Sequence, residues 1–332
     1  MDVGFVNDPM AGKDSRCRWD QILVPGELKS NRSADRASEA WLDLGRYARE
    51  VLAAQDTRRF VLGFTICEPL MRVWVFDRLG SIASDQFDIN KDGLRFVSTV
   101  LGFLWMSEAQ LGFDPTIMTA KDERFIEIER NDSTERIIID EVMQRARCIA
   151  GRATRCWRAH RVEDTRTPLV IKDSWQYAER EEEGEMLREA TDEGVVNVAR
   201  YYHHEIVRVH GRDDDIRSNI RKGLDVTTAA NYRPRRSAVP PSTIATGARR
   251  SGRSGSIADP VRHLRHKADI DAIPNRIHRR VILRDYGNPI YKASSRTALL
   301  AALEGCKDTS KNGVVSPEQM HRQGILGKDA RP

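Results

Sequence analysis

Hydrophobic positions in residues 31–120 recur first at helical spacing, then at the spacing of strands, and then at helical spacing again. From Ser33 onward, apolar residues lie three and four positions apart, which predicts a helix. We expect strands at Phe60–Ile66 and Met71–Asp77, because apolar residues dominate the first and alternate along the second. Helical spacing returns at Leu94–Met106, whose apolar side chains we expect to point inward. The pattern predicts a small α+β unit.

A second region, residues 121–222, shows mainly strand patterns with one helix. The helix is expected at Glu179–Ala190, where an acidic run passes into apolar residues. Apolar or β-branched runs predict strands at Phe125–Glu129, Arg136–Ile139, Leu169–Lys172 and Tyr201–Val209. The run Ala146–His160 is interrupted by Gly151-Arg152-Ala153-Thr154, which is typical of a hairpin turn. We therefore predict the α+β class for the whole chain.

The remaining segments divide into flexible and ordered parts. Residues 1–30 show no periodicity, so we expect a flexible N-terminus. Residues 223–275 are rich in arginine and serine and lack apolar periodicity, which predicts a long disordered insertion. Residues 276–305 read as a strand, a turn and a helix, and residues 306–332 form a tail with little pattern.

Composition and charge predict where the protein is located and exclude several classes of protein. The chain has 332 residues, a formal net charge of +5 and a mean hydropathy of -0.55. Much of the positive charge lies in the predicted insertion, where residues 233–267 contain many arginines and a single acid, Asp259. No apolar run approaches the roughly 18 residues of a membrane span, and the N-terminus has no secretory pattern. The scattered cysteines have no metal-site spacing. We expect a cytoplasmic or nuclear protein without a membrane partner.

Lys172 is the first candidate for chemistry. A lysine at the end of an apolar strand is more often just the point where a buried strand reaches water. Here, however, the turn containing Gly151 precedes it by about one hairpin, and an acidic helix follows it. Glu183 stands three and four positions before Met186 and Leu187, so its carboxylate should emerge beside the packing face of that helix. A strand lysine paired with a helix glutamate is the arrangement by which kinases bind ATP phosphates.

Three other groups have plainer interpretations. Asp213-Asp214-Asp215 suggests a metal cluster, but a solvated turn is the commoner structure for such a run. The segment Tyr201–His210 contains histidines without zinc-ligand spacing, which we interpret as structural. The basic insertion has no aromatic residue between Tyr232 and Tyr286 to stack on bases, so we do not expect nucleic acid binding.

Motifs along most of the chain resemble the fungal-type protein kinase family, a divergent branch of the protein-kinase-like fold. The matching stretches include R-F-V-L-G-F-T-I-C, M-R-V-W-V-F-D-R-L-G-S, L-G-F-D-P-T-I, A-G-R-A-T-R-C-W, V-I-K-D-S-W-Q, E-E-G-E-M-L-R-E-A, D-D-I-R-S-N-I-R-K-G-L and H-R-R-V-I-L-R-D-Y-G-N-P-I-Y-K. The resemblance extends to about Gly305. It implies that residues 121–222 form a kinase-like N-terminal lobe, with an antiparallel sheet and one regulatory helix.

The resemblance also implies roles for individual residues and a nucleotide ligand. Lys172 would bind the phosphates of ATP and Glu183 would hold that lysine in place. Gly151 and Thr154 would belong to the phosphate loop. Asp285 and Gly287 would lie near the hinge, where backbone groups meet adenine. The family's serine- and arginine-rich insertion before the hinge corresponds to residues 223–275.

The pattern of the family breaks after Gly305. Gly324-Ile325-Leu326-Gly327-Lys328-Asp329 echoes the G-I-L-H-R-D of the family's catalytic loop, so Asp329 would take the position of the base. No metal-binding asparagine and no D-F-G follow it, so we expect no encoded Mg²⁺ site, and we predict a catalytically incomplete kinase. The alternative is a non-catalytic interaction module built on half of a kinase. A protein substrate or partner is not indicated by the sequence.

Overall fold

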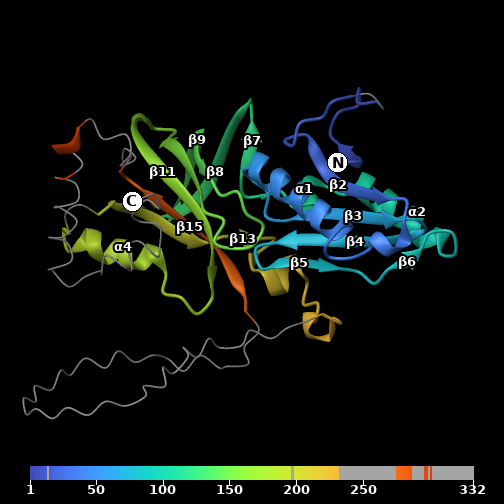
Figure 1. The fold of residues 1–332 in the computed structure, drawn as a ribbon. Coiled ribbons are helices and arrows are strands. Elements are labelled where there is room, and N and C mark those ends of the chain that lie inside the picture. Colours follow the sequence, from blue (N-terminus) through green and yellow to red (C-terminus); the bar gives the residue numbers. More distant parts are fainter. Residues whose placement is uncertain (13–14, 196–197, 232–273, 286–294, 298–299, 301–332) are drawn as a thin grey trace, which may run out of the picture. The chain divides into compact units, whose positions relative to one another are not determined.

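The computed structural model describes residues 1–12, 15–195, 198–231, 274–285, 295–297 and 300 (Figure 1). The chain divides into two compact units, one of residues 1–224 and 275–332 and one of residues 225–274. In the second unit the structure describes a 3-10 turn at Val226–Thr228. The first unit contains two large β-sheets with their helices. The predicted α+β class is confirmed.

The first sheet is mixed and has the strand order β1-β2-β3-β4-β5, with β6 paired to β4. Its strands are β1 Val3–Val6, β2 Ile22–Lys29, β3 Val61–Cys67, β4 Leu70–Asp77, β5 Gly80–Ala83 and β6 Phe87–Asp88. Strands β2 and β3 run parallel, which requires a crossover between them. Helix α1, Ala40–Ala54, makes that crossover and packs on β2 and β3 (Figure 1).

Helices cover both faces of this sheet because its central strands alternate apolar residues between the two faces. On one face, Leu44 and Val51 of α1 pack with Val61, Trp74 and Phe76. The opposite face is covered by α2, Gly93–Trp105, and α3, Glu108–Leu111. The predicted strands at Phe60–Ile66 and Met71–Asp77 are confirmed as β3 and β4, and the predicted second helix is confirmed as α2.

Two predictions for this part of the chain are wrong. Residues 1–30 are not simply flexible, because β1 and β2 pair with each other and β2 pairs with β3. The apolar face of α2 is also not inward: Leu104 and Trp105 are 62% and 79% exposed, whereas Phe103 is buried against Phe5 and Phe64. Since α2 is apolar on nearly all sides, its periodicity did not indicate which side meets the sheet.

The second sheet is antiparallel and has the strand order β12-β15-β11-β10-β9-β8-β7. Its strands are β7 Met118–Ala120, β8 Glu123–Arg130, β9 Ser133–Arg145, β10 Arg155–Arg161, β11 Asp164–Tyr177, β12 Tyr201–Ile206 and β15 Arg276–Leu283. Strand β15, which follows the insertion in the chain, lies between β11 and β12. Figure 1 shows it in orange beside the green strand β11. Three of the four strands predicted in residues 121–222 are confirmed and are longer than expected, whereas the strand predicted at Tyr201–Val209 ends at Ile206 as β12.

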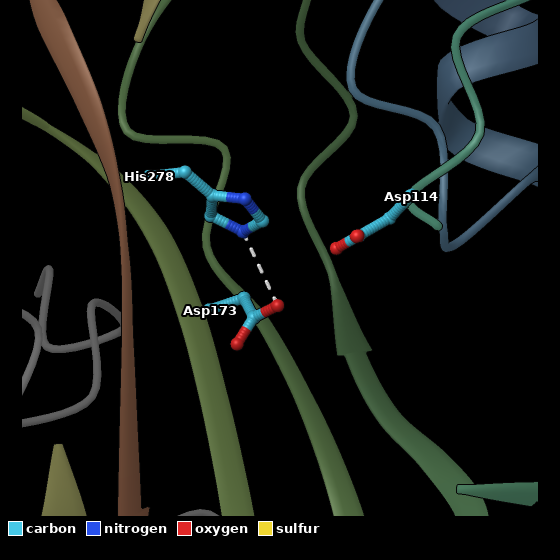
Figure 2. A group of neighbouring side chains, drawn as sticks. All are labelled: Asp114, Asp173 and His278. Carbon is cyan, nitrogen blue, oxygen red and sulfur yellow. Dashed lines mark hydrogen bonds and ion pairs between the residues drawn. The ribbon is translucent and has the colours of Figure 1, made fainter. Parts of the chain in front are cut away.

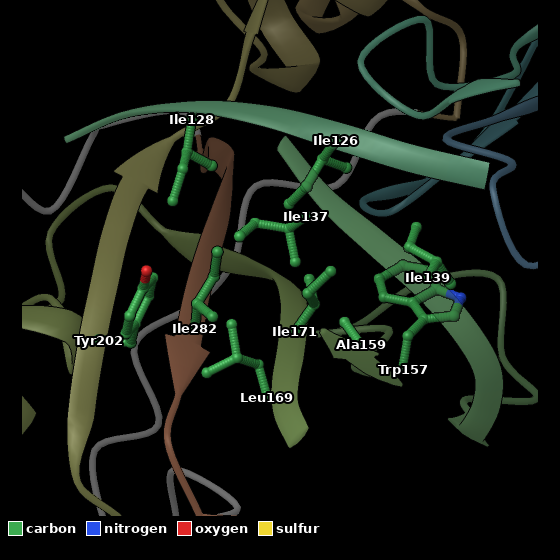
Figure 3. Close-up of a cluster of buried hydrophobic side chains, with 10 residues drawn as sticks. All are labelled: Ile126, Ile128, Ile137, Ile139, Trp157, Ala159, Leu169, Ile171, Tyr202 and Ile282. Carbon is green, nitrogen blue, oxygen red and sulfur yellow. The ribbon is translucent and has the colours of Figure 1, made fainter. Parts of the chain in front are cut away.

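One face of this sheet carries its main core. Alternate residues of β10 and β11, such as Trp157, Ala159, Leu169 and Ile171, point to the same side, as Figure 3 shows. Lys172 follows Ile171 and therefore points to the opposite face, where helix α4, Glu183–Asp192, packs on β12 and β15. A short ribbon, β13 Arg208–Val209 and β14 Arg212–Asp213, precedes a π-helical turn at Ile216–Ile220. None of the described helices is both long enough and apolar enough to cross a membrane.

Candidate functional site

The structure brings Lys172 and Glu183 together. Lys172 stands in the middle of β11, flanked by β10 and β15, and Glu183 is the first residue of α4. The lysine ammonium donates a hydrogen bond to Oε1 of Glu183. The two side chains are 8% and 2% exposed, so the ion pair is largely removed from water. Such a pair is strongly geometry-dependent, because each charge has lost its hydration and depends on the other.

Gly184 allows α4 to approach the sheet closely enough for this contact. A Cβ atom at position 184 would lie 2.2 Å from Cγ of His204 on β12. Because real Cβ atoms essentially never approach another heavy atom so closely, any larger residue would push the helix away from β12. Glu183 is the immediate neighbour of this glycine, so the approach of the helix also sets the position of the carboxylate.

The loop between β9 and β10, residues 146–154, supplies a second cation to Glu183. Nη2 of Arg152 donates to Oε2 of Glu183 over 3.1 Å. The backbone carbonyl of Arg152 accepts from the Trp175 amide over 2.7 Å, which attaches the loop to β11. Gly151 and Ala153 have φ values of +132° and +45°, so the loop turns through backbone conformations that favour glycine.

The same loop is attached to the first sheet through Arg78, in the turn between β4 and β5. Nη1 of Arg78 donates to the carbonyls of Cys148 and Ile149 over 3.0 and 3.3 Å. The amide of Gly151 in turn donates to the Arg78 carbonyl over 3.0 Å. Arg78 is 1% exposed, and its Nη2 also donates to the carbonyl of Arg58 over 2.7 Å. Contacts from the first sheet therefore position the loop that carries Arg152.

On the other face of β11, Asp173 belongs to a buried network of charges. Arg280 donates to both carboxylate oxygens of Asp173, over 2.9 and 3.0 Å. His278 lies between two carboxylates, 3.2 Å from Asp173 and 3.1 Å from Asp214. Arg59, in the connection between α1 and β3, donates to Asp214 over 2.8 Å. Burial opposes a charged imidazole, but the hydrogen bonds to Asp173 and Asp214 prevail and raise the pKa of His278 to about 9.

This network corrects the prediction for Asp213-Asp214-Asp215. Asp213 is exposed, as a solvated turn requires, but Asp214 is fully buried and Asp215 is 9% exposed. Asp215 accepts from the amide of Ser218 over 2.7 Å and so caps the π-helical turn. The prediction of a solvated turn is therefore wrong for two of the three residues. The reason is that distant segments pack on them: Arg59 and His278 bind Asp214, and the side-chain amide of Asn275 donates to Asp215.

Asp114, Asp173 and His278 have ligand atoms within 4.8 Å of one another, the only such metal-compatible group among the described residues (Figure 2). The group does not suit a metal ion. A cation, Arg280, already binds both oxygens of Asp173 and lies 3.5 Å from Asp114. His278 is held as an imidazolium at neutral pH, and an imidazolium has no lone pair for a metal. The cluster is better explained as an ion network that joins the two sheets.

Two other candidate residues, Asp285 and His204, contact other side chains. Asp285, just after β15, forms an ion pair with Arg200, with Nη2 and Oδ1 2.6 Å apart. Hydrogen bonds from the Arg200 side chain hold the pKa of Asp285 below its ordinary value. His204 accepts or donates at Nδ1 with the Tyr201 hydroxyl over 3.0 Å, in keeping with a structural histidine. Gly287, Asp329 and most of the basic insertion fall outside the described residues.

Sequence reasoning missed Arg152 and Arg78 as parts of this site. Arg152 belongs to the G-R-A-T turn that was singled out for Gly151 and Thr154, so the segment was identified but its charged residue was not. The sequence around Arg78, D-R-L-G-S, indicates only a turn. Arg152 contacts Glu183, and Arg78 contacts Cys148 and Ile149, all far away in the sequence. No local sequence pattern could therefore have indicated these contacts.

Comparison with known proteins gives one match. No significantly similar curated protein was found, and no significantly similar solved structure was found. The family model described as fungal protein kinase matches residues 1–323, which is nearly the whole chain. This match covers both sheets and the Lys172–Glu183 pair together. The chain therefore belongs to the fungal protein kinase family.

Proposed function

We propose that the chain binds ATP beside Lys172, in the manner of kinases that phosphorylate serine or threonine hydroxyls. The observation that carries the proposal is the buried ion pair between Lys172 on β11 and Glu183 on α4. In protein kinases a strand lysine contacts the phosphates, and a glutamate from the following helix holds it in position. A buried lysine fixed by one carboxylate has the geometry for that task.

The order of elements around Lys172 supports the same assignment. The strands β9, β10 and β11 are neighbours in the sheet, and the loop 146–154 joins the first two. A phosphate-covering loop has to lie beside the strand that carries the lysine, and this loop does, through the contacts of Arg152 to Glu183 and Trp175. We therefore propose that residues 146–154 cover the phosphates, with Gly151 at the turn and Thr154 as a hydroxyl donor.

In this proposal the described residues bind and orient the nucleotide. Lys172 neutralises phosphate charge, and Glu183 prevents the lysine from turning away when the site is empty of anion. ATP brings the phosphoryl group, and the group that accepts the substrate's proton is proposed to be Asp329. Asp285, two residues after β15, is proposed to border the adenine together with Gly287.

A thermal shift experiment tests nucleotide binding. ATP in EDTA buffer, at 100 times its Kd, should stabilise the wild-type chain by about 2.7 kcal/mol. Lys172→Met should remove most of that stabilisation. Lys91→Met, at an exposed position near the first sheet, should retain it. A wild-type chain whose melting temperature does not respond to ATP or ADP would refute the proposal.

One observation favours the alternative of a non-catalytic interaction module. Leu94, Leu104 and Trp105 on α2 are 80%, 62% and 79% exposed, and large exposed apolar side chains on one helix are typical of interaction surfaces. The two functions predict different results. An interaction module without nucleotide chemistry would show no ATP response but would change its self-association or partner binding on Leu104→Ser. A nucleotide site would show the ATP response in wild type and in this variant alike.

A further inference from the structure

We propose that Arg152 is a second phosphate-binding cation, which together with Lys172 contacts the polyphosphate part of the nucleotide. The inference rests on the proposed nucleotide site and adds a residue to it. Its basis is the convergence of two cations on one buried carboxylate.

The geometry places both cations at the same point. Lys172 donates to one oxygen of Glu183, and Arg152 donates to the other, over 3.1 Å. The two cations therefore share one carboxylate, with one cation on each oxygen. A triphosphate offers many oxygens and several negative charges, so one ligand can contact both groups at once.

The electrostatics of the surroundings favour an anion. Burial, and beyond it the positive charges of Arg180 and Arg276, lower the pKa of Arg152 against the opposing effect of Glu183. The Arg152 side chain is 23% exposed, which leaves it within reach of a ligand while water screens its charge only in part. A phosphate at this position would reduce the repulsion among the neighbouring cations.

The backbone holds Arg152 in place before any ligand arrives. Its carbonyl is bound by the Trp175 amide, and the preceding residue, Gly151, is bound to Arg78 of the first sheet. Because two anchors flank the side chain, little ordering is needed on binding, and preorganised contacts give the larger gain in affinity. The planar guanidinium can also donate two parallel hydrogen bonds to a phosphate, which an ammonium cannot do.

The test measures binding of ATP, ADP, adenosine and inorganic tripolyphosphate by calorimetry to the full chain and three variants. Arg152→Gln removes the charge, and Arg152→Lys keeps the charge without the fork. Arg136→Gln is the matched control, because it breaks an Arg–Glu pair of 2.9 Å elsewhere in the same sheet. We expect Arg152→Gln to weaken ATP binding about tenfold to a hundredfold, with adenosine binding unchanged. Arg152→Lys should fall between, and Arg136→Gln should match wild type.

The outcomes separate this inference from the proposed function. Unchanged ATP affinity in a folded Arg152→Gln chain would overturn the inference alone, and so would equal losses for ATP and adenosine, which would indicate loop positioning. If Arg152→Gln does not fold, the Arg152→Lys variant is measured instead. Wild-type affinity of that variant for both ATP and tripolyphosphate would show that the guanidinium does not donate two parallel hydrogen bonds to a phosphate. A wild-type chain that binds tripolyphosphate but not ATP would refute the nucleotide site, and the effect of Arg152→Gln on tripolyphosphate would then decide the inference. Binding of neither ligand refutes both.

Discussion

Replacing Glu183 by glutamine should destabilise the chain more than replacing Lys172 by methionine. Glutamine keeps the shape of the side chain but removes the charge that Lys172 and Arg152 share. The two cations would then face each other at 8% and 23% exposure with no carboxylate between them. In Lys172→Met, by contrast, Glu183 keeps Arg152 as its partner, and methionine replaces much of the aliphatic part of the lysine.

The expected losses in the free energy of unfolding depend on how much charge each substitution leaves uncompensated. Removing one partner of a buried ion pair costs about 3–5 kcal/mol, and Glu183→Gln removes the carboxylate that both Lys172 and Arg152 bind. Lys172→Met removes one of two partners of Glu183, so we expect a loss on the order of 1–2 kcal/mol. The double variant Lys172→Met/Glu183→Gln should be more stable than Glu183→Gln alone, because it also removes one of the two cations that the carboxylate compensated.

Urea denaturation at neutral pH, followed by tryptophan fluorescence, measures these differences. A loss of 1 kcal/mol corresponds to less than about 2 °C in Tm for a chain of this length, so a thermal scan should rank the variants in the same order. Arg136→Gln serves again as the control for a surface Arg–Glu pair and should change stability by less than 1 kcal/mol. The reasoning fails if Lys172→Met is as destabilising as Glu183→Gln, or if the double variant is the least stable of the three.

Three further predictions concern the surroundings of the site. Gly184→Ala should cost about 1–3 kcal/mol despite the better helix propensity of alanine, because its Cβ would meet His204 at 2.2 Å. The raised pKa of His278 means that its contribution to stability is fully present below about pH 6.5 and is lost as the pH rises through about 9, a loss on the order of 3 kcal/mol that should be absent in His278→Gln. Arg78→Lys should lower stability by about 2–4 kcal/mol and weaken ATP binding, because lysine cannot donate to all the carbonyls that hold the loop 146–154.

Each of these predictions has a direct check. Gly102→Ala on α2 is the control for position 184, because its added Cβ would meet no atom within 4 Å beyond its chain neighbours and the backbone of its own helix, and it should be neutral or stabilising. Equal effects of the two alanines on denaturant midpoints would contradict the packing argument. For His278, parallel pH profiles of wild type and His278→Gln between pH 6.5 and 9 would show that the imidazolium is not formed. For Arg78, wild-type stability with the lysine replacement would show that the loop is not held by the guanidinium.

Local sequence patterns predicted much of the second sheet. They also predicted that Lys172 and Glu183 are in contact. The lysine ends an apolar run that is long enough to identify a buried strand, and the glutamate stands beside the apolar face of a short helix. Whether ATP binds there remains a prediction. The N-terminal strands were missed for a physical reason: β2 combines an apolar run with Pro25 and Gly26, and it is stabilised by pairing with β1 and β3 rather than by its own periodicity.

The sequence by itself determined which segments are strands and helices around the site, and its motifs indicated the family that the match over residues 1–323 shows. Only the tertiary structure decided which partners these segments meet. It places β15 between β11 and β12, buries Asp214 between Arg59 and His278, and brings Arg152 to Glu183. The reason is that spacing along a chain reports which side of an element is apolar, whereas a charged contact depends on what distant segment packs against that side.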